Sequence, residues 1–347
     1  MPATVRPAGI YIEGNASCQL RCPTCPTTSG GYPPEVGHGY LRFADFKQLV
    51  DDNRQVTAVE FENRGELFLN PDFLKIIEYG HRKGLQMTAN GGVNLNDVRP
   101  GVLEGLVKYG FRSLLCSLDG ATAETYRMYR IGGDFDTVIR HIEEINRHKA
   151  AHGSPYPELT WQFVVFGHNE HEIGAARAHA ARLGMKFVAK MSWDSGFSPV
   201  RDVARVKRET GWTAVTREEL EHTTGRNYMR HVCYTLWNNP RINWDGKILG
   251  CCWNSWGDFG GNAFRDGYVA ASNHEKIVHA RAMLTGAAPP RDDIPCSGCG
   301  LYRALRDGGD YLTEREVYWR KGRLYRFMRF VYHRVPLVKP LRRLVGG

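Results

Sequence analysis

The chain has 347 residues, of which 42% are hydrophobic and 24% charged, and its formal net charge is +9. A chain of this length can bury a large core and is expected to form roughly two domains. It contains no apolar run of about 18 residues and no signal-peptide pattern, which argues against a membrane-spanning or secreted protein. Its nine cysteines therefore indicate metal or redox chemistry in a reducing compartment, and we expect a cytoplasmic protein.

Short apolar runs alternate with amphipathic segments in the first half, which is typical of βα units around a parallel sheet. Helices are predicted after Asn70-Pro71, from Asp134 to a stop at Gly153, and from Asn169 to a stop at Gly184. Six such units predict an α/β fold, a curved partial (β/α)6 barrel with its site at the C-terminal strand ends. The predicted strands are residues 9–13, 56–61, 85–88, 112–117, 158–166 and 185–190.

Three cysteines follow the first predicted strand in the spacing C-x3-C-x2-C, at Cys18, Cys22 and Cys25. Three thiolates on one loop can hold three irons of a [4Fe–4S] cluster and leave the fourth iron open for chemistry. A zinc knuckle is the alternative reading. Zinc normally takes four ligands, however, and no further Cys or His occurs before His38.

This loop resembles that of the radical S-adenosylmethionine (SAM) superfamily, in which the open iron chelates the amino and carboxylate groups of SAM. Many members carry an aromatic residue before the third cysteine, where this chain has Thr24. Gly65-Glu66 after the second strand resembles the family element that receives the amino group of SAM, although Leu67 replaces its usual proline. Later strand ends resemble the segments around the ribose, carboxylate and adenine of SAM, which implies binding roles for Thr88, Asn90, Ser117, Asp119, Val165 and Asn169.

A second set of cysteines lies in the second half of the chain. Asp245-Gly246 predicts a type I′ hairpin turn between two short strands, which would bring Cys233 and Cys251 together. The C-x2-C pair at residues 296 and 299 completes a set that can hold a closed [4Fe–4S] cluster, with structural zinc as the alternative. The set is Cys233, Cys251, Cys296 and Cys299.

This second set resembles the twitch form of the family's auxiliary domain, a shortened SPASM domain with one cluster, since no cysteine follows the last pair. Its intervals of 18, 45 and 3 residues agree with those of the radical SAM dehydrogenase of butirosin biosynthesis, which oxidises a secondary alcohol. The resemblance covers about residues 8–305. It implies a barrel at 1–195, a linker at 196–229, a twitch domain at 230–305 and a basic tail at 306–347.

Two [4Fe–4S] clusters and SAM are therefore the expected cofactors. The resemblance implies hydrogen abstraction by a 5′-deoxyadenosyl radical and oxidation of a cyclitol, aminosugar or related glycoside alcohol to a ketone, as in antibiotic biosynthesis. Such an oxidation needs a base, for which Glu62, Lys190 and Asp194 are candidates at strand ends, each with an ordinary salt bridge as the alternative. A sugar epimerase that uses Cys252 as hydrogen donor is the closest rival.

Partners follow from the same resemblance and from charge. Besides a small-molecule substrate, we expect flavodoxin or ferredoxin as electron donor, because such acidic proteins suit a chain of net charge +9. The segment 319–347 has nine Lys or Arg and no acidic residue, so it could contact a membrane surface or pack as a helix. Nucleic acid is not expected. A peptide substrate is less favoured because no leader-binding domain precedes the barrel, and a non-catalytic metal-binding protein is less favoured still.

Overall fold

The computed structural model describes residues 4–32, 36–62, 64–225, 227, 229–251 and 257–318. All six predicted strands are present and join two short ones in an eight-stranded sheet of order β6-β5-β4-β3-β2-β1-β7-β8. Pairing is parallel from β6 to β7, and only β8 runs antiparallel to its neighbour. The strands are β1 Gly9–Glu13, β2 Ala58–Glu62, β3 Gln86–Val93, β4 Ser113–Ser117, β5 Glu158–Val165, β6 Lys186–Met191, β7 Arg241–Ile242 and β8 Ile248–Gly250.

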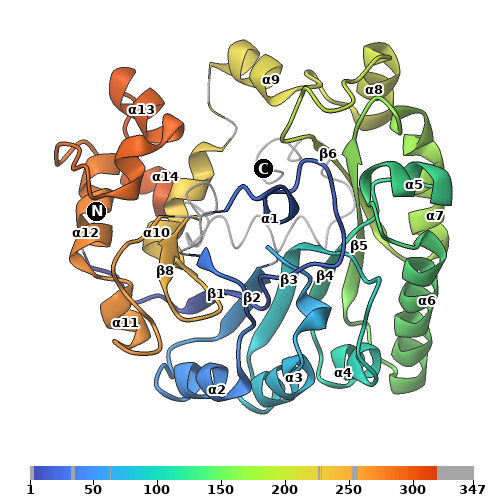
Figure 1. Cartoon of the computed structure of the whole chain (residues 1–347), viewed down its shortest axis with the longest axis horizontal. Helices are drawn as coiled ribbons and strands as arrows, with labels where there is room; N and C mark the ends of the chain where they lie inside the picture. The colour runs from blue at the N-terminus through green and yellow to red at the C-terminus, as the bar shows by residue number, and fades with distance from the viewer. Residues whose placement is uncertain are drawn as a thin grey trace.

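The strands β1 to β6 form an open arc with helices on its outer side (Figure 1). The predicted α/β partial barrel is therefore confirmed. Helices of the barrel half are α1 Pro26–Ser29, α2 Phe43–Asp51, α3 Phe73–Arg82, α4 Val102–Lys108, α5 Ala123–Tyr129, α6 Phe135–His152 and α7 Ile173–Arg182. Short 3-10 helices occur at η2 Leu67–Leu69 and η3 Glu170–Glu172.

The second half of the chain is mainly helical around the short β7–β8 hairpin. The range predicted as a linker, 196–229, contains two helices, α8 Val203–Thr210 and α9 Arg217–Thr224. The helices are α8 Val203–Thr210, α9 Arg217–Thr224, η4 Arg230–Tyr234, α10 Thr235–Asn238, α11 Tyr268–Ala271, α12 Glu275–Leu284, η5 Pro295–Gly298, α13 Gly300–Asp307 and α14 Glu314–Tyr318.

The outer face of the sheet is apolar because alternate strand residues point to opposite faces. On β2, Val59 and Phe61 are fully buried, and Phe61 packs its ring against Phe46 of α2, Phe73 of α3 and Phe111. Glu60 lies between the two and faces the inner side. The core thus sits between the sheet and the outer helices, which leaves the polar positions of each strand to line the inside of the arc.

Local signals in the sequence explain where the longest helix begins and ends. The Asp134 carboxylate accepts a 2.6 Å hydrogen bond from the Thr137 N–H, which caps the start of α6. Gly153 ends the helix in the left-handed conformation, with a φ of 59° that favours glycine. Both ends agree with the predicted helix.

The hairpin predicted around Asp245-Gly246 is present and extends the barrel sheet itself, but the predicted type I′ turn is wrong. The Gly246 N–H donates to the Asn243 carbonyl at 3.0 Å, and of the Asp245-Gly246 pair only the glycine has a positive φ, of 90°. Arg241 pairs with Gly250, and Ile242 with Ile248, across the turn. On its other side β7 pairs with β1, joining Tyr11 to Arg241. The β7–β8 hairpin is consequently paired with the first strand of the barrel, which leads into the loop that carries the first three cysteines.

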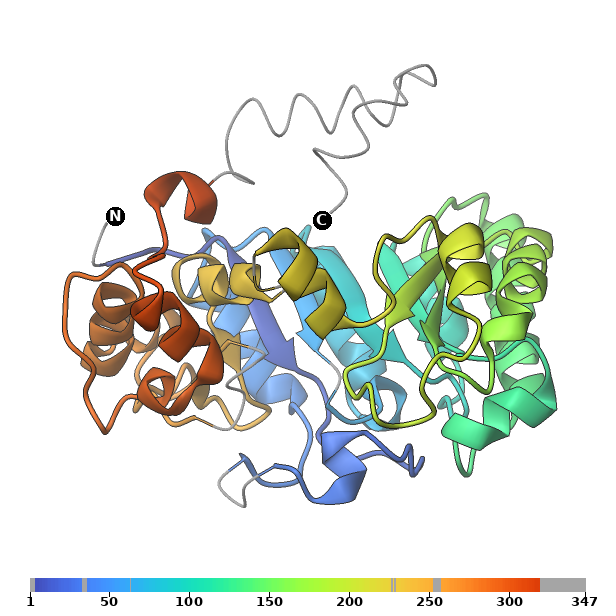
Figure 2. The ribbon, with the colours of Figure 1, turned by 90° about the horizontal axis from the view of Figure 1, so that it is seen from above.

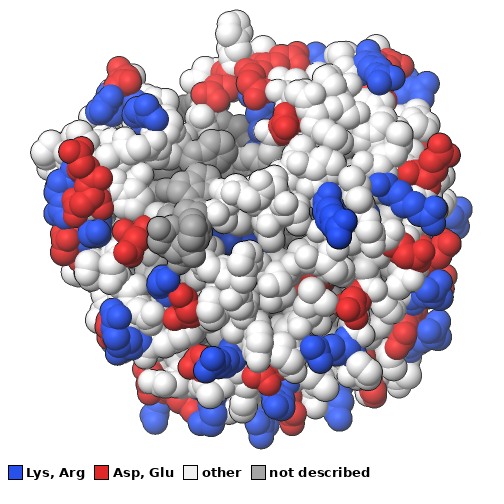
Figure 3. Space-filling view, in the orientation of Figure 1, with Lys and Arg blue, Asp and Glu red and all other residues white. Residues whose placement is uncertain are grey.

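Charged side chains of both signs alternate around the rim of the face shown in Figure 3, and the described part of that face has no large area of one sign. The basic segment 319–347 lies outside the described residues, so its predicted contact with a membrane surface or partner stays a prediction. Among the helices that the structure describes, none is both long and apolar enough to cross a bilayer.

Candidate active site

The first three cysteines lie on the loop between β1 and α1, at the carboxyl end of β1, and Figure 2 shows this blue segment below the sheet. Cys22 is buried, Cys18 and Cys25 are half-buried, and all three are free thiols that pack beside Tyr129 and Phe166. Burial, together with the nearby charges of Glu66 and of the other two thiols, raises the pKa of the Cys18 thiol to about 12. Bound metal ions would reverse this shift because they deprotonate a coordinating thiol.

Gly65 fixes the segment after β2 directly on the cysteine loop. Its N–H donates to the Asn15 carbonyl at 3.0 Å, and the Glu66 N–H donates to the Ser17 carbonyl at 2.7 Å. A Cβ at position 65 would lie 2.2 Å from the Ser17 carbonyl oxygen and 2.5 Å from that of Asn15. Only glycine fits this contact, which explains why position 65 is a glycine.

Glu66 is 1% exposed and its carboxylate lies at the junction of the second and third strand ends. One oxygen accepts a 2.7 Å hydrogen bond from the Asn94 N–H, and the other accepts a 3.4 Å bond from the Phe68 N–H. Burial raises the pKa of this carboxyl from 4.5 to about 7. A buried carboxylate with unused lone pairs beside a thiol loop is suited to receive an ammonium group.

Asn94 and Arg130 belong to this site, and the sequence analysis missed both. The Asn94 Nδ2 donates to the Cys18 Sγ at 3.6 Å, and an Arg130 Nη1 donates to the Cys22 Sγ at 3.6 Å. Arg130 also pairs with Asp119, which is fully buried. The Asp119 carboxylate raises the pKa of Arg130, so the guanidinium keeps a fixed positive charge next to the thiols.

Each of the two missed residues had a signal in the sequence. Asn94 is the first residue after β3, but the predicted strand ended five residues too early, at residue 88. The signal for Arg130 did not single it out, because it is a basic residue eleven positions after Asp119 and Arg127 lies between them.

Thr88 and Asn90 lie within β3, so the prediction that they end the third strand is wrong. The strand continues through a register shift between Ala89 and Val93, an irregularity that alternation of residue types does not reveal. Thr88 Oγ1 donates to the Glu60 carboxylate, and the Asn90 Nδ2 donates to it at 3.0 Å. These side chains form a polar network on the inside of the arc. None of these contacts involves the cysteine loop.

Asp119 joins the ends of β4 and β5. Its Oδ1 accepts a 2.6 Å hydrogen bond from the Val164 N–H, and its carbonyl accepts a 2.8 Å bond from the Asn169 Nδ2. Asn169 also donates to the Val164 carbonyl at 2.9 Å and is fully buried. Val165 is buried in the core on the opposite face of β5. Of these residues, Asp119 is connected to the cysteine loop, because its ion-pair partner Arg130 donates to the Cys22 Sγ.

Ser117 and Lys190 are brought together by a residue that the sequence analysis did not select. The Lys190 Nζ donates to the Gln162 Oε1 at 2.6 Å, and the Gln162 Nε2 donates to the Ser117 Oγ at 3.2 Å. Burial lowers the pKa of Lys190. A lysine shifted toward its neutral form inside the arc can accept a proton.

Of the remaining base and donor candidates, only Asp194 has a described side chain. The Asp194 carboxylate is exposed and accepts hydrogen bonds from the Gly196 and Phe197 N–H groups, so it closes a turn after β6. Glu62 is the last residue of β2, and its side chain lies outside the described part of the chain. Cys252 also lies outside the described residues.

The second cysteine set comes from three separate places in the chain, one of them the C-x2-C pair. Cys233 lies in η4, Cys251 follows β8, Cys296 lies in η5 and Cys299 precedes α13. Burial raises the pKa of the Cys296 thiol, and the charges of Cys251 and Cys299 raise it further, which places these three thiols near one another. Three of the set are fully buried and Cys299 is half-buried.

The first donor set fits an iron–sulfur cluster, and three thiols of the second set, those of Cys251, Cys296 and Cys299, lie near one another. Buried thiols on short turns are soft donors, and neighbouring N–H groups can stabilise the negative charge of a ligated thiolate. At the first site, Asn94 and Arg130 supply such N–H groups to two of the three cysteines.

The chain resembles several curated proteins over part of its length, and no protein-family model matches it. The mycofactocin maturase MftC of Mycobacterium ulcerans is 30% identical over 182 residues, which are 51% of this chain and 45% of MftC. The AdoMet-dependent heme synthase of Methanosarcina barkeri is 30% identical over 147 residues, 42% of this chain and 40% of the synthase. The chain thus spans less than half of these relatives.

Solved structures agree with the fold over most of the chain. SuiB of Streptococcus suis bound to S-adenosylmethionine aligns with a TM-score of 0.57 and 14% identity, covering 86% of this chain and 71% of SuiB. The enzyme anSMEcpe with bound AdoMet aligns with a TM-score of 0.56 and 17% identity, covering 94% of this chain and 98% of anSMEcpe. The chain therefore has the fold of the radical SAM enzymes.

Proposed function

We propose that the chain is a radical SAM oxidoreductase with two [4Fe–4S] clusters. The observation that carries this proposal is the docking of Gly65-Glu66 on the cysteine loop, with Asn94 and Arg130 bonded to two of its sulfurs. This arrangement combines three cluster ligands with a buried anion after β2 and a half-buried cation at the end of α5. The first cluster would be held by Cys18, Cys22 and Cys25, and the second by Cys233, Cys251, Cys296 and Cys299.

Two charged side chains match the two charged ends of the SAM amino-acid moiety. The Glu66 carboxylate would accept from the ammonium group, and the Arg130 guanidinium would donate to the carboxylate. Arg130 is held in place by Asp119, so its charge is positioned before SAM binds. We expect SAM to bind across the cysteine loop between these residues.

A first cluster held by the three loop cysteines would supply the electron for cleavage of SAM to methionine and a 5′-deoxyadenosyl radical, and a second cluster would accept the electron that a substrate radical loses. For an alcohol carbon, loss of a hydrogen atom, the hydroxyl proton and one electron yields a ketone. Lys190 is the best-placed base because it lies inside the arc with a lowered pKa. Gln162 holds the Lys190 Nζ in place through their 2.6 Å hydrogen bond, so that the neutral amine can accept the proton.

The substrate in this proposal is a secondary alcohol of a cyclitol, aminosugar or related glycoside, in a pathway such as antibiotic biosynthesis. The agreement of the second cysteine spacing with a dehydrogenase of that kind supports it. Flavodoxin or ferredoxin would supply the electron for SAM cleavage.

Anaerobic reconstitution tests the proposal. We expect two clusters per chain, and 5′-deoxyadenosine should form when dithionite and SAM are added. Replacing Cys18, Cys22 and Cys25 by alanine should leave one cluster and abolish SAM cleavage, whereas replacing Cys296 and Cys299 should retain the first cluster. Zinc without iron–sulfur absorption in strictly anaerobic protein would contradict the proposal.

A peptide substrate is a second candidate, favoured by the comparisons. Two of the similar proteins are a mycofactocin maturase and SuiB, and SuiB has also been solved bound to its precursor peptide SuiA. Mass spectrometry separates the two candidates. A peptide encoded beside this chain that loses two mass units would favour the peptide, and an aminosugar that does so would favour the alcohol oxidation.

Epimerisation is distinguished from oxidation by the source of hydrogen. A dehydrogenase gives a product two mass units lighter than its substrate. In that case, replacing Cys252 by alanine should leave part of the turnover. A product at the oxidation level of the substrate that carries one deuterium from deuterated water, lost in Cys252→Ala, would establish an epimerase instead.

A further inference from the structure

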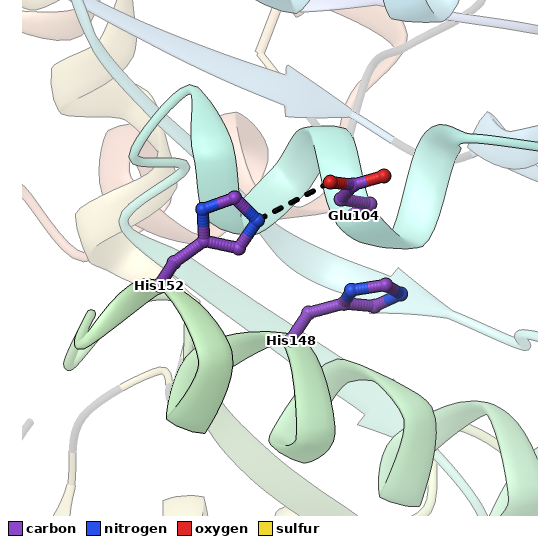
Figure 4. A group of neighbouring side chains, drawn as sticks. All are labelled: Glu104, His148 and His152. Carbon is purple, nitrogen blue, oxygen red and sulfur yellow. Dashed lines mark hydrogen bonds and ion pairs between the residues drawn. The ribbon is translucent and has the colours of Figure 1, made fainter.

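A histidine pair on α6 faces a carboxylate on α4, outside the proposed active site. His148 and His152 are four residues apart, so their imidazoles project from the same side of the helix. Figure 4 shows both side chains directed toward Glu104 of α4. One ligand atom from each of the three residues lies within 4.8 Å of the other two. Two helices that are distant in sequence therefore present three metal-binding groups to one point.

The contacts already present hold two of the three groups together. The His152 Nε2 lies 3.3 Å from the Glu104 Oε1. The His148 Nε2 lies 3.6 Å from a carboxylate oxygen of Glu144, one turn earlier on α6. A carboxylate beside an imidazole nitrogen is the usual arrangement that orients a metal-ligating histidine. The 3.6 Å separation is longer than a hydrogen bond, and a small rotation would let Glu144 orient the His148 ring while the other ring nitrogen binds the metal.

The groups are accessible and have room to adjust. The side chains of Glu104, His148 and His152 are 50%, 28% and 35% exposed. Ligands of a tetrahedral zinc ion at about 2.0–2.2 Å are roughly 3.3–3.5 Å from one another. His152 and Glu104 are already 3.3 Å apart, and the other pairs need to approach by at most about 1.5 Å, which rotation of partly exposed side chains permits.

We propose that Glu104, His148 and His152 form a divalent-metal site that takes zinc. Two imidazoles and one carboxylate are a donor set that zinc accepts, with water in the fourth position, and imidazole disfavours magnesium and calcium. The ion would bridge α4 and α6 on the outer side of the sheet. Its effect is therefore to tie two helices together, and it takes no part in chemistry at the cysteine loop.

Zinc binding to the cluster-loaded protein tests the site. Equilibrium dialysis against 10–50 μM ZnCl2, on the order expected for a three-ligand surface site, should add one zinc per chain to the wild type. His148→Ala, His152→Ala and Glu104→Gln should each lose it, and alanine keeps the helix intact. His222→Ala removes an exposed histidine of α9 and should bind as the wild type does.

X-ray absorption at the zinc edge identifies the ligands. Nitrogen or oxygen scatterers at about 2.0–2.1 Å without sulfur at about 2.3 Å are expected. Zinc should also raise the thermal midpoint of the wild type and of His222→Ala by a few degrees but leave the three site variants unchanged. Equal zinc content in wild type and site variants, or sulfur in the first shell, would overturn the proposal. Neither result depends on SAM cleavage, which is measured separately.

Discussion

Replacing Glu66 by glutamine should change stability and SAM binding in opposite directions. The carboxyl is 1% exposed, and burial moves its pKa from 4.5 to about 7. One pKa unit corresponds to about 1.4 kcal/mol, so the ionised carboxylate costs about 3 kcal/mol above pH 7 when no ammonium is bound. Glutamine removes this cost. Part of this gain is lost because the glutamine NH2 would face the Phe68 N–H, and we expect a net rise in the free energy of unfolding of about 1–3 kcal/mol at pH 8.

The sign of the pH dependence follows from the raised pKa. Between pH 4.5 and 7 the folded protein binds more protons at Glu66 than the unfolded chain does, so this residue lowers stability progressively as the pH rises through that window. Below pH 4.5 the penalty is absent. The Glu66→Gln variant lacks this dependence and should differ from the wild type more at pH 8 than at pH 5.5.

The same substitution should weaken SAM binding. Loss of a charge-assisted hydrogen bond to the ammonium group costs about 1.5–3 kcal/mol, which is roughly a 10- to 150-fold rise in Kd. Anaerobic calorimetry on cluster-loaded protein measures the Kd, and the thermal midpoint at pH 5.5 and 8 measures stability. Glu143→Gln, an exposed carboxyl on α6, is the control. A variant that is less stable at pH 8 and binds SAM normally would refute the reasoning.

Three further substitutions test other contacts of the site. Gly65→Ala should cost about 1–3 kcal/mol and lower the iron content, because its Cβ would lie 2.2 Å from the Ser17 oxygen; Gly174→Ala in α7, whose nearest new contact is 3.6 Å, should keep full iron content. Arg130→Gln should lower the free energy of unfolding by about 3–5 kcal/mol, as measured by denaturant titration, because it leaves Asp119 buried without its ion pair; unchanged stability would contradict this. Lys190→Met should leave SAM cleavage measurable as 5′-deoxyadenosine but reduce ketone formation at least 10²-fold; equal loss of both would show a structural role.

The sequence by itself determined the architecture of the barrel. Strand positions followed from apolar runs of the right length, and helix ends followed from local groups such as Asp134 and Gly153, whose effects act within a few residues. The three cysteines of the first loop were equally visible, because their spacing is contained in a single short segment. Such signals need no knowledge of the rest of the chain.

Only the tertiary structure decided which side chains meet at the site. Arg130 reaches Cys22 across 108 residues, and Asn94 reaches Cys18 across 76, contacts that no local pattern encodes. The true end of β3 was missed because its register shift depends on pairing with β4. Gly65 and Glu66 were selected from sequence, but the reason for the glycine, a backbone approach to Ser17, required the folded chain. Sequence specifies local conformation, whereas packing of distant segments fixes the electrostatics of the site.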